Sequence, residues 1–305
     1  MRSKCWGGVF DEPINPAPDI TAPSTESLTR IQIDDETMAV VGSANWYAIA
    51  YGNGKYVAIS NDGYATTSTN GSEWTTPKQV TSNSLYDILF ADGKFVAVGT
   101  KTLVYSTDGN TWTTVTSSAL SSAWLSKIAY GNGIFVVCDG SYSYTSTDLA
   151  TWSTKKYIGT TSVRTLTYGN GRFIATGNTG FCASSEDGQT WTKLNTNLGS
   201  VSANRCVYGN GKFVISTSGT IYTSVDGANW TEIVMKSPAI GYLYVNDLVY
   251  SKSRFVWIGY RLSNGVKTYL VATSSDGEIW TDFAPLKDEN GEDLTADPTA
   301  MIVMP

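Results

Sequence analysis

The sequence contains no histidine and only four cysteines in 305 residues. Without histidine, the usual serine and cysteine hydrolase triads have no general base, and the common zinc sites lose one of their main ligands. The cysteines show no Cys-x-x-Cys spacing, so we expect small buried residues in strands, in a protein assembled in a reducing cytoplasm. They are Cys5, Cys138, Cys182 and Cys206. Neither a metal nor a cofactor is predicted.

The chain also lacks long apolar runs and any excess of positive charge. No stretch approaches the roughly 18 apolar residues of a membrane span. The net charge is −6, which does not favour binding to nucleic-acid phosphate. The chain reaches Asp11 and Glu12 without an apolar segment, so no secretory signal peptide is expected. We therefore predict no membrane span and no nucleic-acid partner.

Aromatic residues and glycine are abundant, with 10 Trp, 18 Tyr and 29 Gly, and they recur in a repeat of two halves. The first half reads aromatic-Gly-Asn-Gly-basic-aromatic. It is complete at 51–56, 168–173 and 208–213, altered at 90–95 and 130–135, and degraded at 250–255. The second half, Ser-x-Asp-Gly-x-x-Trp, ends at Trp74, Trp112, Trp152, Trp191, Trp230 and Trp280.

A period of about forty residues with four short strands per unit is typical of a β-propeller. In the fourth repeat, residues 163–168 favour a strand and Gly169-Asn170-Gly171 favours a tight hairpin turn. Further strands are expected at 172–176, 181–185 and 190–194. We predict an all-β fold, a single β-propeller of six four-stranded blades, at 44–80, 83–119, 122–158, 161–197, 201–237 and 243–283.

Two segments lie outside the repeats. Residues 1–43 form a Pro-rich arm followed by strand-like runs at 30–33 and 37–41, and residues 284–305 form an acidic segment with an apolar run at 300–304. The ring must close, because open blades would expose strand edges. In one closure, six blades close on each other and a terminal run such as 301–303 adds an edge strand. In the other, both termini build a degenerate seventh blade. Within the sixth repeat of the propeller (44–283), residues 259–267 are expected to insert a loop.

The second half of the repeat resembles the Asp-box, the repeat of the bacterial neuraminidase type (BNR). The resemblance and the residue types imply a turn in which the carboxylate accepts backbone N–H groups, the glycine is left-handed, and the tryptophan fills the seam to the next sheet. Two copies depart, with Asn in place of Asp in the first and Leu149 in place of Gly in the third. The structural Asp-box positions are Asn70, Trp74, Asp108, Trp112, Asp148, Trp152, Asp187, Trp191, Asp226, Trp230, Asp276 and Trp280.

Sialidases carry Asp-boxes, so the resemblance also suggests a second hypothesis, that the protein hydrolyses a sialoside. That chemistry needs three arginines, a Tyr–Glu nucleophile pair and an aspartic acid/base. Arg164, Arg205 and Arg261 suffice in number, but the glutamates of the repeats lie in Asp-box turns or in a fourth strand. No partner is evident for a nucleophilic tyrosine. We predict no catalytic residues and no enzymatic activity, and a sialidase-like glycoside hydrolase is the less favoured alternative.

In a propeller of this connectivity, the Gly-Asn-Gly and Asp-box turns share one face. The opposite face carries the turns between second and third strands and the connections between blades, which vary most in this sequence. Aromatic and polar groups mixed around one mouth suit a glycan or a protein loop. The candidate binding residues are Tyr86, Asp87, Trp124, Lys127, Tyr142, Arg164, Arg205, Tyr242, Asp247 and Arg261.

Over residues 46–283, the combined repeat resembles propellers of tailed-phage virion and tail proteins. The resemblance implies a structural virion protein of the tail, fibre or head decoration, assembled in the host cytoplasm within a larger assembly. Its terminal arms would contact other virion proteins, and the propeller would bind a host-surface glycan or protein. Photosystem assembly factors carry related repeats, so a protein-binding propeller of that class is the alternative. Sortilin-like receptors do too, but they should have the signal peptide and disulfides that this sequence does not predict.

Overall fold

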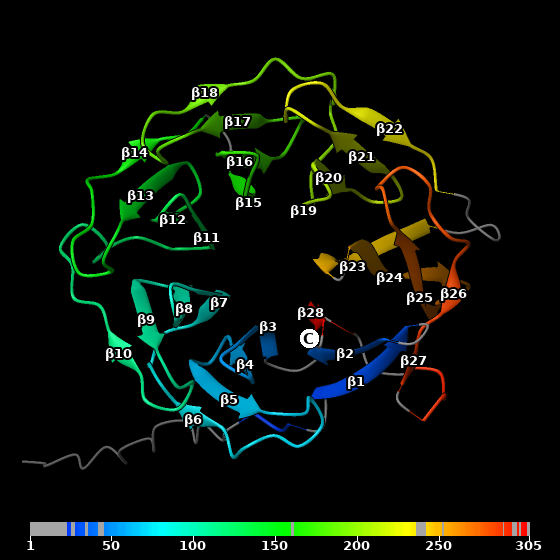
Figure 1. Cartoon of the computed structure of the whole chain (residues 1–305), viewed down its shortest axis with the longest axis horizontal. Coiled ribbons are helices and arrows are strands. Elements are labelled where there is room, and N and C mark those ends of the chain that lie inside the picture. The colour runs from blue at the N-terminus through cyan, green and yellow to red at the C-terminus, as the bar shows by residue number, and fades with distance from the viewer. Residues whose placement is uncertain are drawn as a thin grey trace, which may run out of the picture.

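In the computed structural model, antiparallel four-stranded sheets are arranged around a central axis (Figure 1). The structure describes residues 23–25, 28–33, 36–41, 46–159, 162–235, 242–251, 253–288, 290–294, 298 and 300–303. These residues contain no helix, and so none that could cross a membrane. The predicted all-β propeller with six four-stranded repeat blades is confirmed.

Each repeat forms one blade, with its first strand nearest the axis and its fourth at the rim (Figure 1). Blades 1 to 3 comprise β3 (Trp46–Gly52), β4 (Lys55–Ser60), β5 (Tyr64–Ser68), β6 (Lys78–Gln79); β7 (Leu85–Ala91), β8 (Lys94–Gly99), β9 (Thr102–Ser106), β10 (Thr113–Thr114); and β11 (Lys127–Gly131), β12 (Ile134–Cys138), β13 (Tyr142–Ser146), β14 (Lys156–Tyr157). Blades 4 to 6 comprise β15 (Val163–Gly169), β16 (Arg172–Gly177), β17 (Cys182–Ser185), β18 (Thr192–Lys193); β19 (Arg205–Gly209), β20 (Lys212–Ser216), β21 (Ile221–Ser224), β22 (Thr231–Ile233); and β23 (Tyr242–Ser251), β24 (Arg254–Ser263), β25 (Val266–Ser274), β26 (Ala284–Pro285).

The fourth strands are shorter than expected, with two or three residues each. In blade 4, for example, β18 covers only part of the predicted 190–194 strand. The fourth strand has a partner on one side only, because it is the outer edge of its sheet. The rim therefore contributes little regular pairing, and the inner three strands form most of each blade.

The Gly-Asn-Gly motif builds the turn between the first and second strands. Asn170 and Gly171 both have positive φ, 47° and 75°, which is the backbone of a type I′ hairpin turn. The preceding Gly169 has a different role, since a Cβ there would lie 2.1 Å from Cγ of Tyr208 in the next blade. One glycine of the motif thus makes the turn, and the other lets the next aromatic ring lie on the backbone.

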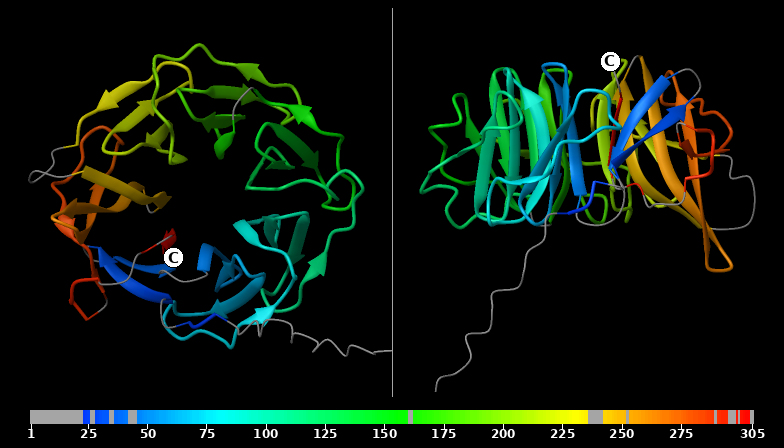
Figure 2. Two further views of the ribbon diagram at one scale, coloured as in Figure 1. Left: turned by 180° about the vertical axis from the view of Figure 1, so that it is seen from behind. Right: turned by 90° about the horizontal axis from the view of Figure 1, so that it is seen from below.

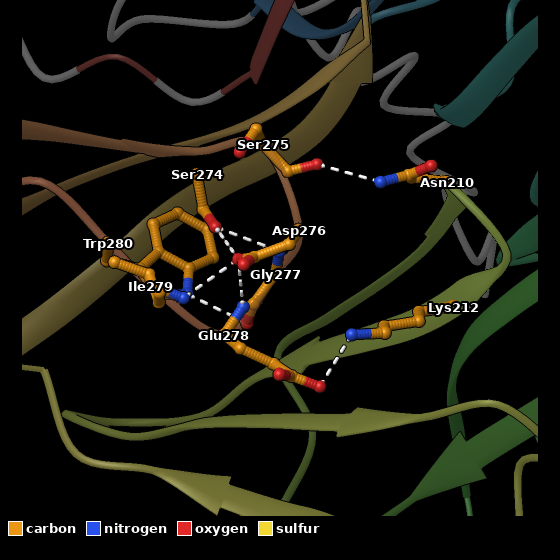
Figure 3. A network of polar contacts seen from close by, with 9 residues as sticks. All are labelled: Asn210, Lys212, Ser274, Ser275, Asp276, Gly277, Glu278, Ile279 and Trp280. Atoms are coloured by element: carbon orange, nitrogen blue, oxygen red, sulfur yellow. Dashed lines mark hydrogen bonds and ion pairs between the residues drawn. The ribbon is translucent and has the colours of Figure 1, made fainter.

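The Asp-box turns have the internal hydrogen bonds expected from the sequence (Figure 3). In blade 6, Oδ1 of Asp276 accepts the N–H groups of Glu278 and Ile279, both at 2.8 Å. The indole N–H of Trp280 donates to the carbonyl of Gly277 at 3.0 Å. The carboxylate is therefore used within its own turn. Among the described residues, no group of three or more acidic or cysteine side chains could hold a metal ion.

The two halves of the repeat hold each other across the seam between blades. Nδ2 of Asn210, in the turn of blade 5, donates to the carbonyl of Ser275 in the Asp-box of blade 6 at 3.0 Å (Figure 3). Beside it, Lys212 pairs with Glu278. A side chain of the first half thus fixes the second half of the next repeat. The same bond joins Asn53 to Thr107 and Asn170 to Val225.

The hydrogen bonds of the Asp-boxes predict a loss of stability in acid. They lower the pKa of Asp108, Asp148, Asp187, Asp226 and Asp276. For Asp187, partial burial acts in the opposite direction, yet the N–H groups of Thr190 and Gln189 bring the pKa to about 2. The folded-state pKa lies below the unfolded value of about 3.9. The stabilisation is therefore complete above the unfolded pKa and is lost as the pH falls through the folded one.

We accordingly expect the free energy of unfolding, measured by urea titration, to decrease between about pH 4 and pH 2. Asp187→Asn should keep the turn and make this decrease shallower. Asn70 shows that asparagine fits, since its Oδ1 accepts the N–H groups of Ser72 and Glu73 at 3.1 and 2.9 Å. A pH dependence unchanged by Asp187→Asn would contradict the assignment.

The core is divided among the seams between neighbouring sheets, where seven clusters of buried apolar side chains lie. Phe173, for example, packs with Val136 between blades 3 and 4. Trp191, the tryptophan of the Asp-box in blade 4, packs against the same cluster. The tryptophans therefore fill seams, as predicted. The fully buried aromatic residues that follow each Gly-Asn-Gly turn are Tyr56, Phe95, Phe135, Phe173, Phe213 and Phe255.

Both ends of the chain close the ring in one further four-stranded sheet, which we call the terminal sheet. Its strands from rim to axis are β27 (Lys287–Asp288), β1 (Leu28–Ile33), β2 (Glu36–Val41) and β28 (Ala300–Val303). The two N-terminal strands predicted at 30–33 and 37–41 are confirmed. The strand order also shows how the ring closes: of the two closures considered, it is the one in which both termini build a sheet together. Figure 1 shows this sheet between blades 6 and 1.

The terminal sheet is packed on both sides like the repeat blades. Ile31 and Met301 lie in one cluster with Val256 of blade 6, and Leu28 lies in another with Trp46 of blade 1. The proline-rich residues 1–22 and Cys5 lie outside the described residues. The other three cysteines are buried and unpaired, as expected: Cys138, Cys182 and Cys206.

Candidate functional site in the central cavity

A cavity of about 890 Å³ lies where the innermost strands begin. All six repeat blades and the terminal sheet contribute to its wall. It lies on the face opposite the Gly-Asn-Gly turns, because those turns end the same strands. The aromatic, amide and charged residues in the wall are Tyr47, Tyr86, Asp87, Lys127, Arg164, Asn204, Arg205, Tyr244, Asn246, Asp247, Tyr260 and Lys267.

A β-bulge lies at the cavity wall in four of the six repeat blades. The register of the first strand with the second shifts by one residue in β3, β7, β15 and β23. In a regular strand, two successive side chains point to opposite faces. At each bulge, two successive residues both line the cavity, such as Tyr86 with Asp87 and Arg164 with Thr165. Successive residues also line the cavity where the first strand has no register shift, as Lys127 and Ile128 do in blade 3, so the bulges are not required for this lining.

Asp87 joins two innermost strands. Its Oδ1 accepts the N–H of Ile88 and its Oδ2 accepts the N–H of Ile128 on β11, both at 3.1 Å. Burial raises the pKa of Asp87, whereas Lys127 and the two N–H donors act to lower it. Both carboxylate oxygens are thus committed to backbone groups of the wall.

Asp247 occupies the equivalent position in blade 6 and joins it to the terminal sheet. Its Oδ2 accepts the N–H of Met301 on β28 at 2.8 Å, and its Oδ1 accepts Nε of Arg205 and the N–H of Leu248 at 2.8 and 2.9 Å. The Asp247 side chain is 9% exposed and that of Arg205 is 38% exposed. Asp247 therefore holds the closing strand in the ring while its partner Arg205 faces the cavity.

Arg164 is held in place by neutral groups. Its Nε donates to the carbonyl of Ala203 at 2.8 Å, and its Nη atoms reach Oδ1 of Asn204 at 3.1 Å and Oδ1 of Asn178 at 3.4 Å. These contacts orient the guanidinium group without cancelling its charge. Arg164 remains exposed at the mouth of the cavity.

The sixth blade does not contain the loop predicted at 259–267, and that expectation is wrong. β24 and β25 continue as a paired hairpin, in register from Phe255 opposite Ser274 to Ser263 opposite Val266. The connection is the two-residue turn Asn264-Gly265, with φ of 51° and 79°, a type I′ turn that extends a hairpin rather than opening a loop. The hairpin projects beyond the ring in the side view of Figure 2.

The lengthened blade adds aromatic residues to the cavity wall. Tyr244 and Tyr260 stack with ring centroids 4.8 Å apart, and Nζ of Lys267 lies 4.6 Å from the centroid of the Tyr260 ring. These three residues were not among the ten binding residues predicted from the sequence. The alternation of Tyr260 and Leu262 before Asn264-Gly265 was the signal for a hairpin that could have revealed them.

Six of the ten predicted binding residues line the cavity: Tyr86, Asp87, Lys127, Arg164, Arg205 and Asp247. Three others lie outside its wall. Trp124, 62% exposed, belongs to the connection between blades 2 and 3. Tyr142 begins a third strand, two strands from the axis, and packs on Tyr157. Arg261 lies on the extended hairpin opposite Thr268. The side chain of the tenth, Tyr242, lies outside the described residues.

A second cavity of about 600 Å³ lies at the other end of the same strands. Leu166 and Cys206 belong to the walls of both cavities, so the two cavities adjoin. Burial raises the pKa of Cys206 to about 12, which keeps this thiol neutral. The aromatic residues around the second cavity are those of the repeat motif: Tyr51, Tyr130, Tyr168, Tyr208 and Tyr250.

The comparison with known proteins concerns the propeller. The model of a family described as the DUF6242 beta propeller domain matches residues 158–305, from the end of blade 3 to the terminal sheet. No curated protein matches the sequence.

Several solved structures have a similar fold. A structure described as YCF48 bound to D1 peptide has a TM-score of 0.62 at 16% identity, over 87% of this chain and 88% of that one. YCF48 from Cyanidioschyzon merolae has a TM-score of 0.59 at 12% identity, over 84% and 87%. The GH74 enzyme of Niastella koreensis has a TM-score of 0.57 at 20% identity, over 83% of this chain and 42% of the enzyme. At these identities the likeness shows a shared β-propeller fold.

Proposed function

We propose that this protein is a non-enzymatic binding module that receives a segment of a partner protein in the central cavity. The composition of the cavity wall carries this proposal, because tyrosines, amides and charged groups from all six repeat blades converge there. The volume of about 890 Å³ is within the range of ligand sites in proteins. Tyrosine and arginine are also the residues enriched where protein interfaces gain most of their binding energy.

The arrangement of the charged groups supports binding rather than hydrolysis. Of the three arginines considered for a sialoside carboxylate, Arg205 is paired with Asp247 and Arg261 lies outside the cavity wall. Asp87 and Asp247, the two acids in the wall, accept backbone N–H groups. These contacts give both carboxylates a structural use.

We favour the alternative of a protein-binding propeller, like that of photosystem assembly factors, over the virion setting, because of a likeness to a solved structure. A propeller of similar fold holds a peptide in the structure described as YCF48 bound to D1 peptide. The phage virion setting, with its glycan receptor and virion partners, stays a prediction from the repeat resemblance. Neighbouring genes for capsid and tail proteins would support it.

An unbiased peptide library tests the proposed function. The immobilised protein should enrich peptides whose affinity falls when a residue of the cavity wall is replaced. Tyr47→Ala, at a 50% exposed ring that packs edge-on against Tyr86, should weaken them by about tenfold, since one aromatic contact contributes about 1 kcal/mol or more. Fluorescence anisotropy measures the affinities.

The matched control is Tyr157→Ala, which removes a 55% exposed tyrosine from β14 at the rim. It should leave the affinities unchanged. A library that yields no binder, or binders equally tight for Tyr47→Ala and the unmodified protein, would contradict a segment-binding cavity.

A further inference from the structure

The cations of the cavity wall are arranged as an arc over neighbouring blades. Blades 3, 4, 5 and 6 each contribute one: Lys127, Arg164, Arg205 and Lys267. Blades 1 and 2 contribute none of the lining cations, and present Tyr47 and Tyr86 instead. The whole chain carries a net charge of −6, so the arc is opposite in sign to the protein that surrounds it. Such local concentration of one charge focuses the field within a cleft.

The two acids of the wall balance only part of this arc. Asp87 directs one oxygen to the N–H of Ile88 and the other to that of Ile128, and Asp247 is bound by Arg205 and by two backbone N–H groups. In the part of the chain that the structure describes, no carboxylate lies within ion-pair distance of Lys127 or Arg164. Arg164 is therefore available to a ligand, and Lys127, whose charge acts to lower the pKa of Asp87, forms no ion pair with it.

Arg164 is also preorganised for a carboxylate. A guanidinium group has five N–H donors in a rigid fork, which matches a carboxylate. Three of them are directed to Ala203, Asn204 and Asn178, so the side chain is held while other donors remain. Holding a charged group in place before binding lowers the entropic cost of the contact.

We propose that the segment received by the cavity is acidic, with its carboxylates held by Lys127 and Arg164 and its remaining chain lying against the tyrosines of blades 1 and 2. This inference rests on the proposed function and specifies its ligand. Charge complementarity is its basis: the arc attracts glutamate and aspartate side chains and repels basic segments.

The test uses three short fluorescein-labelled peptides in which glycine alternates with glutamate, glutamine or lysine. Anisotropy should show binding of the glutamate peptide, weakened by salt, and little binding of the other two. The double variant Lys127→Ala/Arg164→Ala should weaken the glutamate peptide by about tenfold or more, because hydrogen bonds to charged groups contribute about 1.5–3 kcal/mol. Lys78→Ala/Lys193→Ala removes two charges from exposed rim strands and should have no such effect.

Three outcomes would overturn the proposal: no binding of the glutamate peptide, equal binding of the glutamine peptide, or equal loss in both double variants. An acidic oligosaccharide that binds where the glutamate peptide does not would also overturn it. The library experiment separates this failure from failure of the proposed function. Neutral or basic library peptides that depend on Tyr47 would keep the binding cavity and reject the acidic ligand.

Discussion

Replacing Gly188 by leucine is expected to lower the free energy of unfolding by about 2–5 kcal/mol, the sum of left-handed backbone strain and overpacking. Gly188 follows the aspartate of the fourth Asp-box and has φ of 69°. A Cβ at this position would lie 2.5 Å from Cγ2 of Val136 in the preceding blade. Urea unfolding followed by tryptophan fluorescence measures the change.

The third Asp-box provides the matched control, because leucine is already present there. Leu149 has φ of 65° and is 2% exposed, packed with Val96 and Phe135. Leu149→Gly loses the buried side chain, worth about 2–5 kcal/mol, and recovers about 1–2 kcal/mol of left-handed strain. Its net effect should be smaller than that of Gly188→Leu. Equal losses, or a harmless Gly188→Leu, would show that the seams between blades can adapt to either residue.

Asp247→Ala is expected to lower the free energy of unfolding by about 2–3 kcal/mol and to release β28. The change leaves the buried N–H of Met301 without its acceptor and removes the carboxylate that pairs with Arg205. Breaking a buried pair costs about 3–5 kcal/mol, and we reduce that value because Arg205 is 38% exposed and screened by solvent. Hydrogen exchange should become faster at residues 300–303.

Asp87→Ala is the control for this second prediction. Asp87 has the same place in its blade and also joins two innermost strands, but both strands belong to repeats. Its loss should leave the exchange of β28 unchanged. If Asp87→Ala and Asp247→Ala accelerate exchange at 300–303 to the same extent, Asp247 does not specifically hold the closing strand.

The parts of the fold that could be predicted are those encoded within a few residues. Asn170-Gly171 requires a type I′ turn wherever it occurs between strands, and an aspartate such as Asp276 folds its turn around its own carboxylate. These local devices recur six times, so the number of repeat blades and their four strands followed from the sequence. Even Asn70, a departure from the motif, makes the same turn.

The shape of the candidate site could not be predicted in the same way. Tyr86 and Asp87 both line the cavity at a bulge whose position depends on pairing with β8. Tyr244, Tyr260 and Lys267 meet there because β23, β24 and β25 extend together, whereas we expected a loop. Trp124 was selected from the connection into a first strand and Tyr142 from a turn between second and third strands, but their distance from the axis is decided by strand order. Whether a residue lies in the cavity wall therefore depends on how the strands pair and in which order, and not on the type of residue.

The terminal sheet has a consequence for the kinetics of folding. Within a repeat blade, pairing joins residues close in sequence, as in the hairpin of β15 and β16. In the terminal sheet, Val41 pairs with Ala300, so nearly the whole chain forms the loop that must be closed. Loop closure costs entropy before the contacts form, and non-local pairing slows folding. The hairpins within each blade can therefore form early, whereas the terminal sheet, and with it the closed ring, forms only when the two ends of the chain meet.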